Sequence, residues 1–177
     1  MHPVGGGRTV SRRRVWLLDV DGVINASRPG WSERPHRAEI TANGQPWRMR
    51  WSPSMVRAIR EIALSGEVDV VWATTWCPWA DQLEAMFGLP RLPLAFSADA
   101  LAAKPAPELK VRVALAEVER GSLLIWTDDD AIPISGEERR KLDDSGALLI
   151  SPASNRGLQP PDLDRVRSQL RDWRTRD

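Results

Sequence analysis

The 177-residue sequence has almost no cysteine, no tyrosine and no long apolar run. The single cysteine, Cys77, excludes an internal disulfide and suits a reducing compartment. No apolar segment approaches the roughly 20 residues needed to cross a bilayer, and none before Asp19 has the length of a signal-peptide core. A formal net charge of +1 neither predicts nor excludes a nucleic-acid partner. We therefore expect a cytoplasmic protein with no membrane partner.

The chain has the length and composition of one globular domain. Residues 1–14 contain a glycine run and an arginine run and are predicted to be a flexible basic tail, which leaves 15–177 as the domain. Apolar and amphipathic segments alternate along it in an order typical of an α/β fold. We predict a Rossmann-like three-layer sandwich with a mostly parallel five-stranded sheet. The expected strands are 15–20, 68–73, 92–96, 123–126 and 147–150.

The helices are expected between these strands. One runs to Ser65 and is capped by Ser52 or Ser54, because a serine before Pro53 is a typical helix start. The other expected helices are 79–87, 107–120, 136–144 and 161–173.

Residues 25–51 are predicted to form a hairpin or flap inserted after the first strand. Asn43-Gly44 is a strong signal for a two-residue hairpin turn. Arginines in this segment could contact phosphates and its tryptophans could stack on bases. Alternatively, the tryptophans pack the hairpin onto the core and the arginines are solvated. The residues concerned are Trp31, Arg34, His36, Arg37, Trp47, Arg48, Arg50 and Trp51.

The most informative segment is the apolar run that ends in Asp19 and Asp21, with Gly22 directly after them. Residues i and i+2 of a strand point to the same side, so the two carboxylates are expected together at the strand end. Like charges at that separation repel, and either a cation between them or protonation of one relieves the repulsion. An ordinary turn is the alternative, because Asp and Gly are common turn residues.

Two further strands end in polar residues. The second strand ends in Thr74 and Thr75, and the fourth runs into Asp128, Asp129 and Asp130. In a parallel sheet all these ends lie at one edge, where such folds place their sites. A group of carboxylates with few cations nearby needs a metal ion, and oxygen ligands of this kind suit Mg²⁺.

These strand ends carry a recognisable set of motifs. Residues 19–22 resemble the first motif of the haloacid dehalogenase (HAD) superfamily, 70–74 the second and 124–129 the fourth. The third motif is a lysine at the head of a helix. Lys104, in Lys-Pro-Ala-Pro-Glu, is the favoured candidate, and Lys110 is the alternative. Members of this superfamily are mostly Mg²⁺-dependent phosphatases, so the resemblance implies that activity.

A finer resemblance lies in the sequence around the motifs. The segments 72–76 and 126–129, together with Gly157-Leu158, are similar to the HAD domain of Swiss Army Knife RNA repair proteins. That resemblance implies a link to RNA.

The resemblance also implies roles for individual residues. Asp19 is the expected nucleophile that forms an aspartyl-phosphate, and Asp21 the expected general acid and base. Thr74 and the lysine, Lys104 or Lys110, are expected to donate to the phosphoryl oxygens. Backbone amides near Gly22 and Thr75 are expected to face the phosphate. The expected Mg²⁺ ligands are Asp19, Asp21 (through its main-chain carbonyl), Asp128 and Asp129.

The segments between the motifs leave room for only a minimal cap, so the site is expected to be open. An open site suits a large phosphorylated substrate such as a nucleic-acid end, or a nucleotide. A small-metabolite phosphatase or a phosphotransferase with the same intermediate is one alternative. A binding module that has lost turnover is another, and the intact set of Asp19, Asp21 and Asp128 argues against it.

Overall fold

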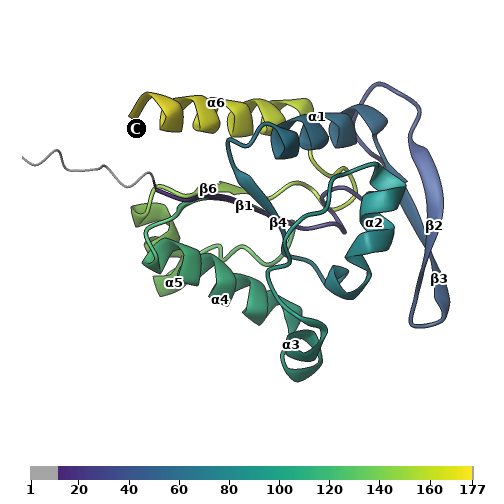
Figure 1. Cartoon of the computed structure of the whole chain (residues 1–177), viewed down its shortest axis with the longest axis horizontal. Coiled ribbons are helices and arrows are strands. Elements are labelled where there is room, and N and C mark those ends of the chain that lie inside the picture. Colours follow the sequence, from purple (N-terminus) through teal and green to yellow (C-terminus); the bar gives the residue numbers. More distant parts are fainter. Residues whose placement is uncertain (1–11, 177) are drawn as a thin grey trace, which may run out of the picture.

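The computed structural model describes residues 12–176, which form three layers (Figure 1). The middle layer is a parallel sheet whose strands lie in the spatial order β4 (Asp69–Trp72), β1 (Arg14–Leu18), β5 (Leu123–Thr127) and β6 (Leu148–Ile150). One face is covered by α1 (Pro53–Leu64) and α6 (Pro160–Arg176), and the other by α4 (Ala106–Glu119) and α5 (Gly136–Asp144).

Strand β1 lies inside the sheet because its side chains can be buried on both faces. Trp16 of β1, Trp72 of β4 and Trp126 of β5 are among the largest fully buried side chains. The indole N–H of Trp16 donates to Thr127 Oγ1 at 2.9 Å. The side chains of these three tryptophans thus form the centre of the core.

The predicted hairpin is confirmed. It consists of β2 (His36–Ala42) and β3 (Gln45–Trp51), paired antiparallel. Asn43 and Gly44 form the turn with φ values of 53° and 71°, as a two-residue turn with two positive φ angles requires. The hairpin stands outside the main sheet, beside α2 (Ala80–Phe87) (Figure 1).

Two tryptophans of the inserted segment pack onto the body of the domain. Trp51 is 6% exposed and meets Phe87 edge-on, with ring centroids 5.1 Å apart. The indole N–H of Trp31 donates to the main-chain oxygen of Leu158 at 2.8 Å. Trp47 differs, because 52% of its surface is exposed. The packing interpretation therefore holds for Trp31 and Trp51.

The prediction of a fifth strand in the sheet is wrong. Residues 92–96 form one isolated parallel bridge, between Leu94 and Trp72. Trp72 N donates to Pro93 O at 2.9 Å, and Ala95 N donates to Trp72 O at 2.8 Å. The ladder stops there because Pro93 has no N–H to donate and because Trp72 is the last residue of β4. The main sheet of the described chain therefore has four strands.

A short helix, α3 (Ala98–Ala103), follows this segment and was not expected from the hydrophobic pattern. Its start is fixed by Ser97, whose Oγ accepts from Ala100 N at 3.2 Å. None of the helices between residues 12 and 176 is both long and apolar enough to span a membrane.

Residues 1–11 of the predicted tail lie outside the described residues. The last part of that segment belongs to the body of the domain. Arg14 begins β1, and Arg12 Nε donates to the main-chain oxygen of Gly121 at 2.7 Å.

The start of α1 is held by two acceptors. Ser52 is the N-cap, and its Oγ accepts from Met55 N at 3.2 Å. Glu33, from the loop before β2, accepts from Ser54 N at 2.7 Å, from Ser54 Oγ at 2.8 Å and from the Ser52 hydroxyl. Burial raises the pKa of Glu33, but these hydrogen bonds outweigh it and hold the pKa below its usual value. Glu33 thus ties the inserted segment to α1.

We expect Glu33→Gln to lower the free energy of unfolding by about 1 kcal/mol at neutral pH. The folded-state pKa of Glu33 lies below that of the unfolded chain, so its contribution is present above about pH 4.3 and is lost as the pH falls through the folded value. Urea unfolding at pH 7 and at pH 3 measures this. Glu119→Gln, at an exposed site on α4, is the control. If Glu33→Gln lowered the free energy of unfolding equally at pH 7 and at pH 3, Glu33 would not be the ionised acceptor described here.

Candidate active site

The register of the sheet brings the first and fourth predicted motifs together. β1 pairs with β5 in parallel, so the residues that follow the two strands are neighbours. Asp19 N donates to Thr127 O at 3.1 Å, and Asp128 N donates to Ile150 O at 3.1 Å. Both aspartates are therefore fixed at the carboxyl edge of the sheet by ladder hydrogen bonds.

A buried lysine joins these two aspartates. Lys110 Nζ lies 2.6 Å from Asp19 Oδ2 and 2.8 Å from Asp128 Oδ2. The side chains of Lys110, Asp19 and Asp128 are only 6%, 6% and 0% exposed. We call these three residues the charged triad. Its one ammonium faces two carboxylates, so an excess of negative charge remains.

Lys110, and not the favoured Lys104, is the lysine that the structure places against Asp19. Lys104 is the C-cap of α3, and its Nζ lies 3.3 Å from Glu108 Oε1 on the surface. Lys110 shares the buried face of α4 with Ala114 and Glu117. That helical spacing of i, i+4 and i+7 is the sequence signal that could have identified Lys110.

Burial and charge act in opposite directions within the charged triad. Burial raises the pKa of Asp19, the Lys110 ammonium opposes the increase, and Asp128 adds to it. For Lys110, burial alone would lower the pKa, but Asp19 and Asp128 raise it to about 12. Lys110 therefore carries its proton at any physiological pH.

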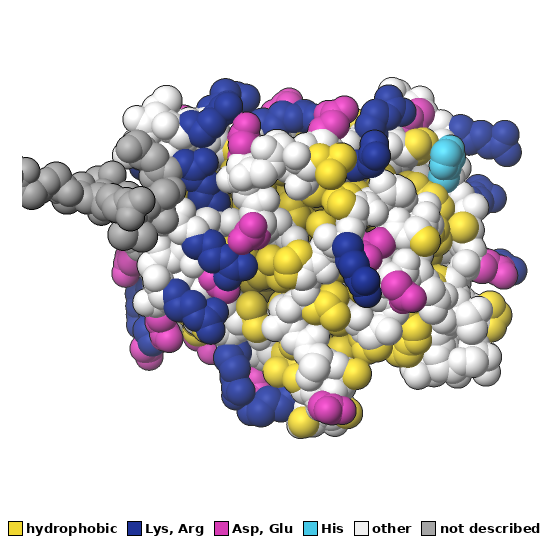
Figure 2. Space-filling view, viewed as in Figure 1, with side chains coloured by type: hydrophobic (Ala, Val, Ile, Leu, Met, Phe, Trp, Pro, Cys, Tyr) yellow, Lys and Arg dark blue, Asp and Glu magenta, His cyan; other side chains and the backbone are white. Residues whose placement is uncertain are grey.

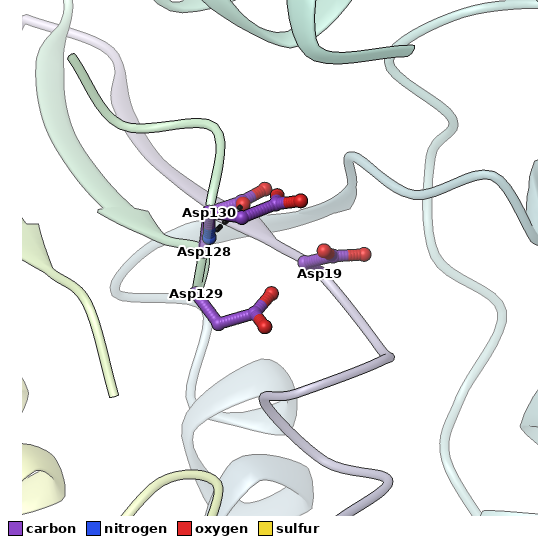
Figure 3. Close-up of side chains that lie close together, drawn as sticks. All are labelled: Asp19, Asp128, Asp129 and Asp130. Atoms are coloured by element: carbon purple, nitrogen blue, oxygen red, sulfur yellow. Dashed lines mark hydrogen bonds between the residues drawn. The ribbon is translucent and has the colours of Figure 1, made fainter. Parts of the chain in front are cut away.

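The structure gathers four carboxylates into a set with the geometry of a metal site. Ligand atoms of Asp19, Asp128, Asp129 and Asp130 all lie within 4.8 Å of one another. In Figure 3 all four side chains extend to the same side of the segments that carry them. Burial raises the pKa of Asp129 and of Asp130, and the neighbouring acids raise both further. A cation among them would relieve this repulsion.

The donor atoms fit a hard divalent cation. All are carboxylate oxygens, which Mg²⁺ prefers. Asp128 Oδ1 accepts from Ala131 N at 2.8 Å, whereas Asp128 Oδ2 is buried and has no partner but the Lys110 ammonium among the described residues. An oxygen in this state is available as a ligand.

Among the expected ligands, this set of side-chain oxygens contains Asp19, Asp128 and Asp129. The expected Asp21 ligand is its main-chain carbonyl, which is not a side-chain oxygen and stays a prediction. The carboxylate of Asp21 is not part of the set, since Asp21 Oδ2 accepts from Trp76 Nε1 and Asp21 Oδ1 from Asn25 Nδ2, both at 2.8 Å. Asp130 belongs to the set although sequence analysis did not select it as a ligand. The available signal was its place in the acidic run that follows β5.

The remaining expected residues also lie at this edge. Thr74 is fully buried after β4, and its Oγ1 accepts from Trp76 N at 3.3 Å, while Thr75 is exposed. Gly22 has φ 68°, and a Cβ there would lie 2.1 Å from Asp129 Oδ2. Only glycine leaves room for Asp129 in this position.

An open cavity of about 790 Å³ lies beside these residues. It reaches Asp21 and Gly22, and the hairpin supplies one of its sides. The cavity thus opens to solvent at the Asp21 end of the site, although the charged triad itself does not line it. No separate cap domain is present within residues 12–176.

The sequence between residues 15 and 163 matches a family model described as the HAD domain in Swiss Army Knife RNA repair proteins. The chain belongs to this family. No curated protein and no solved structure matches it. The resemblance inferred from the motifs is thus confirmed, and HAD domains are mostly phosphohydrolases.

We expect Mg²⁺ to raise the thermal midpoint of this HAD domain. An ion at 100 times its dissociation constant adds about 2.7 kcal/mol, and each kcal/mol shifts the midpoint by about 2–4 °C in a chain of this size. Asp128→Asn should abolish the shift, because it removes a charged ligand and keeps the shape.

Asp172→Asn, at an exposed site on α6, is the matched control and should keep the shift. Asp128→Asn also alters the Lys110 ion pair. The readout is therefore the change on adding Mg²⁺, measured by scanning fluorimetry, and not the midpoint itself. An unchanged shift in Asp128→Asn would count against this cluster as the metal site.

Proposed function

We propose that this HAD domain is a Mg²⁺-dependent phosphohydrolase that forms an aspartyl-phosphate on Asp19. The observation that carries the proposal is the charged triad, in which one buried ammonium touches both Asp19 and Asp128 at the carboxyl edge of the sheet. A carboxylate beside a fixed cation, within a group of further acids, suits phosphoryl transfer, where catalysis depends on positioning and charge stabilisation.

The carboxylates of Asp19, Asp128 and Asp129 would hold the Mg²⁺ ion, with the main-chain carbonyl of Asp21 as a further ligand. Asp130 lies close enough to support this shell. When bound, the ion neutralises negative charge on the phosphoryl group and on the acids around it.

The chain's own groups carry the chemistry. An Asp19 oxygen forms a bond to phosphorus while the bond from phosphorus to the leaving oxygen breaks, and Asp21 gives that oxygen its proton. Water then attacks the aspartyl-phosphate, Asp21 takes the water proton, and phosphate leaves Asp19. The Thr74 hydroxyl and the Lys110 ammonium donate to the phosphoryl oxygens throughout.

Lys110 has a second task in this mechanism. Asp19 attacks only as a carboxylate, yet burial raises its pKa. The ammonium 2.6 Å away lowers that pKa and favours the ionised form. Burial outweighs this attraction, so the pKa of Asp19 is still raised to about 7, and Lys110 limits the increase without cancelling it.

The proposed substrate is a phosphorylated nucleic-acid end or a nucleotide. Two observations support it: the match to a HAD domain of RNA repair proteins, and the open cavity beside Asp21. If the true substrate is a small phosphate ester, the substrate panel described below would detect it.

We expect Asp19→Asn to lower kcat by more than about a thousandfold, because it removes the proposed nucleophile. The panel contains p-nitrophenyl phosphate, nucleotides, and oligonucleotides phosphorylated at the 3′ or 5′ end, each with Mg²⁺ and with EDTA. Asp172→Asn serves as control. Full activity of Asp19→Asn on any of these esters would overturn the mechanism.

We expect Trp76→Phe to impair proton donation by Asp21, because its indole N–H is one of two donors that fix that carboxylate. An alkyl phosphate needs a protonated leaving group and a nitrophenyl phosphate hardly does, so kcat should fall about tenfold more for the alkyl ester.

Trp79→Phe is the matched control, since Trp79 stacks edge-on against Trp76 at 6.0 Å and makes no hydrogen bond to Asp21. Steady-state kinetics on both esters distinguish a role in orienting Asp21 from a role in packing alone. Equal losses on the two esters in Trp76→Phe would show that Trp76 is only a packing residue.

A further inference from the structure

One face of the β2–β3 hairpin carries arginines in an arrangement that costs stability. Arg37 lies directly opposite Arg50 in the strand register, and the next pair on the same face is Glu39 and Arg48. Like charges directly opposite each other destabilise an antiparallel pair. Three guanidinium groups and one carboxylate therefore share this face.

The hairpin offers little to neutralise these arginines. Arg48 Nε lies 3.6 Å from Glu39 Oε1, but the Arg48 side chain is 91% exposed, so the pair is weak. Arg37 is exposed and forms no ion pair with any residue between 12 and 176. Figure 2 shows Lys and Arg side chains standing along the right edge, over β2 and β3.

Arg50 connects this face to the active site. Its Nη1 donates to the main-chain oxygen of Ser27 at 2.5 Å, and its main-chain N–H donates to Asn25 Oδ1 at 2.9 Å. The amide of Asn25 in turn donates to Asp21. The arginine face is thus held at a fixed position relative to Asp21.

The space between them is the open cavity of about 790 Å³. The residues that line it include Arg37, Glu39, Arg48 and Arg50 of the hairpin, Asn155, and Asp21 and Gly22 of the loop after β1. It extends well beyond the volume that one phosphate would fill. We call it the arginine groove.

We propose that the arginine groove binds the phosphodiester backbone of a nucleic-acid strand whose terminal phosphate is removed at Asp19. The inference rests on the proposed function, because it takes the scissile phosphate to lie at Asp19. Guanidinium groups bind phosphate oxygens in a bidentate manner, and a bound backbone offsets the repulsion between Arg37 and Arg50. A small ester would leave these arginines without an anion.

The test compares an arginine double variant with a charge-matched one. Arg37→Gln/Arg48→Gln removes two groove cations and leaves Arg50, which holds the loop. Arg60→Gln/Arg140→Gln removes the same charge from exposed sites on α1 and α5. KM is measured with Mg²⁺ on p-nitrophenyl phosphate and on single-stranded oligonucleotides phosphorylated at the 3′ or 5′ end.

We expect the groove variant to raise KM for the oligonucleotides at least about tenfold and to leave KM for p-nitrophenyl phosphate unchanged. The slope of log affinity against log salt should become shallower by about 1.4, since two contacts to a single strand are lost. The control variant should match the wild type. Unchanged oligonucleotide KM and salt slope in the groove variant would overturn the proposal.

A second measurement does not depend on turnover. Fluorescence anisotropy in EDTA gives the affinity for an oligonucleotide with hydroxyl ends. Weaker binding by the groove variant supports the proposal even if no ester is hydrolysed, a result that would refute only the proposed function. If ATP displaced the oligonucleotide at a concentration as low as that of the oligonucleotide itself, the groove would bind a nucleotide and not a strand, and the proposal would be wrong.

Discussion

The ion contacts of Lys110 with Asp19 and Asp128 are the constraint on which the rest of the structure depends. Burying charges is expensive unless they are paired with good geometry, and removing one partner leaves an uncompensated charge. The pairing is possible only because β1 and β5 are adjacent and in register, and because α4 packs with Lys110 facing the sheet. Sheet order, helix packing and site chemistry therefore depend on one another.

Features encoded by neighbouring residues were predictable from the sequence. The Asn43-Gly44 turn requires two positive φ angles, and these residue types supply them. The start of α1 follows from a serine before a proline. The approach of Asp19 and Asp128 was predictable for a different reason, since parallel strands place their carboxyl ends at one edge whatever the loops between them do.

Features that depend on contacts between residues far apart in the chain were not predictable from the sequence. Residues 92–96 have the composition of a strand, but the length of β4 and a proline limit them to one bridge. Lys104 had the more familiar motif, whereas the choice of Lys110 depends on which face of α4 is buried. Asp130 enters the acidic cluster through the bend after β5, and its place in the acidic run did not by itself distinguish a ligand from a loop acid.

Gly22 allows two loops that are far apart along the chain to pass close to each other. The loop after β1 passes so close to Asp129 that the acid occupies the place where any larger residue would project its first carbon. A side chain at this position would have to displace the Asp129 carboxylate and would also strain the backbone, whose φ is 68°. Engineering of either loop therefore has to take the other into account.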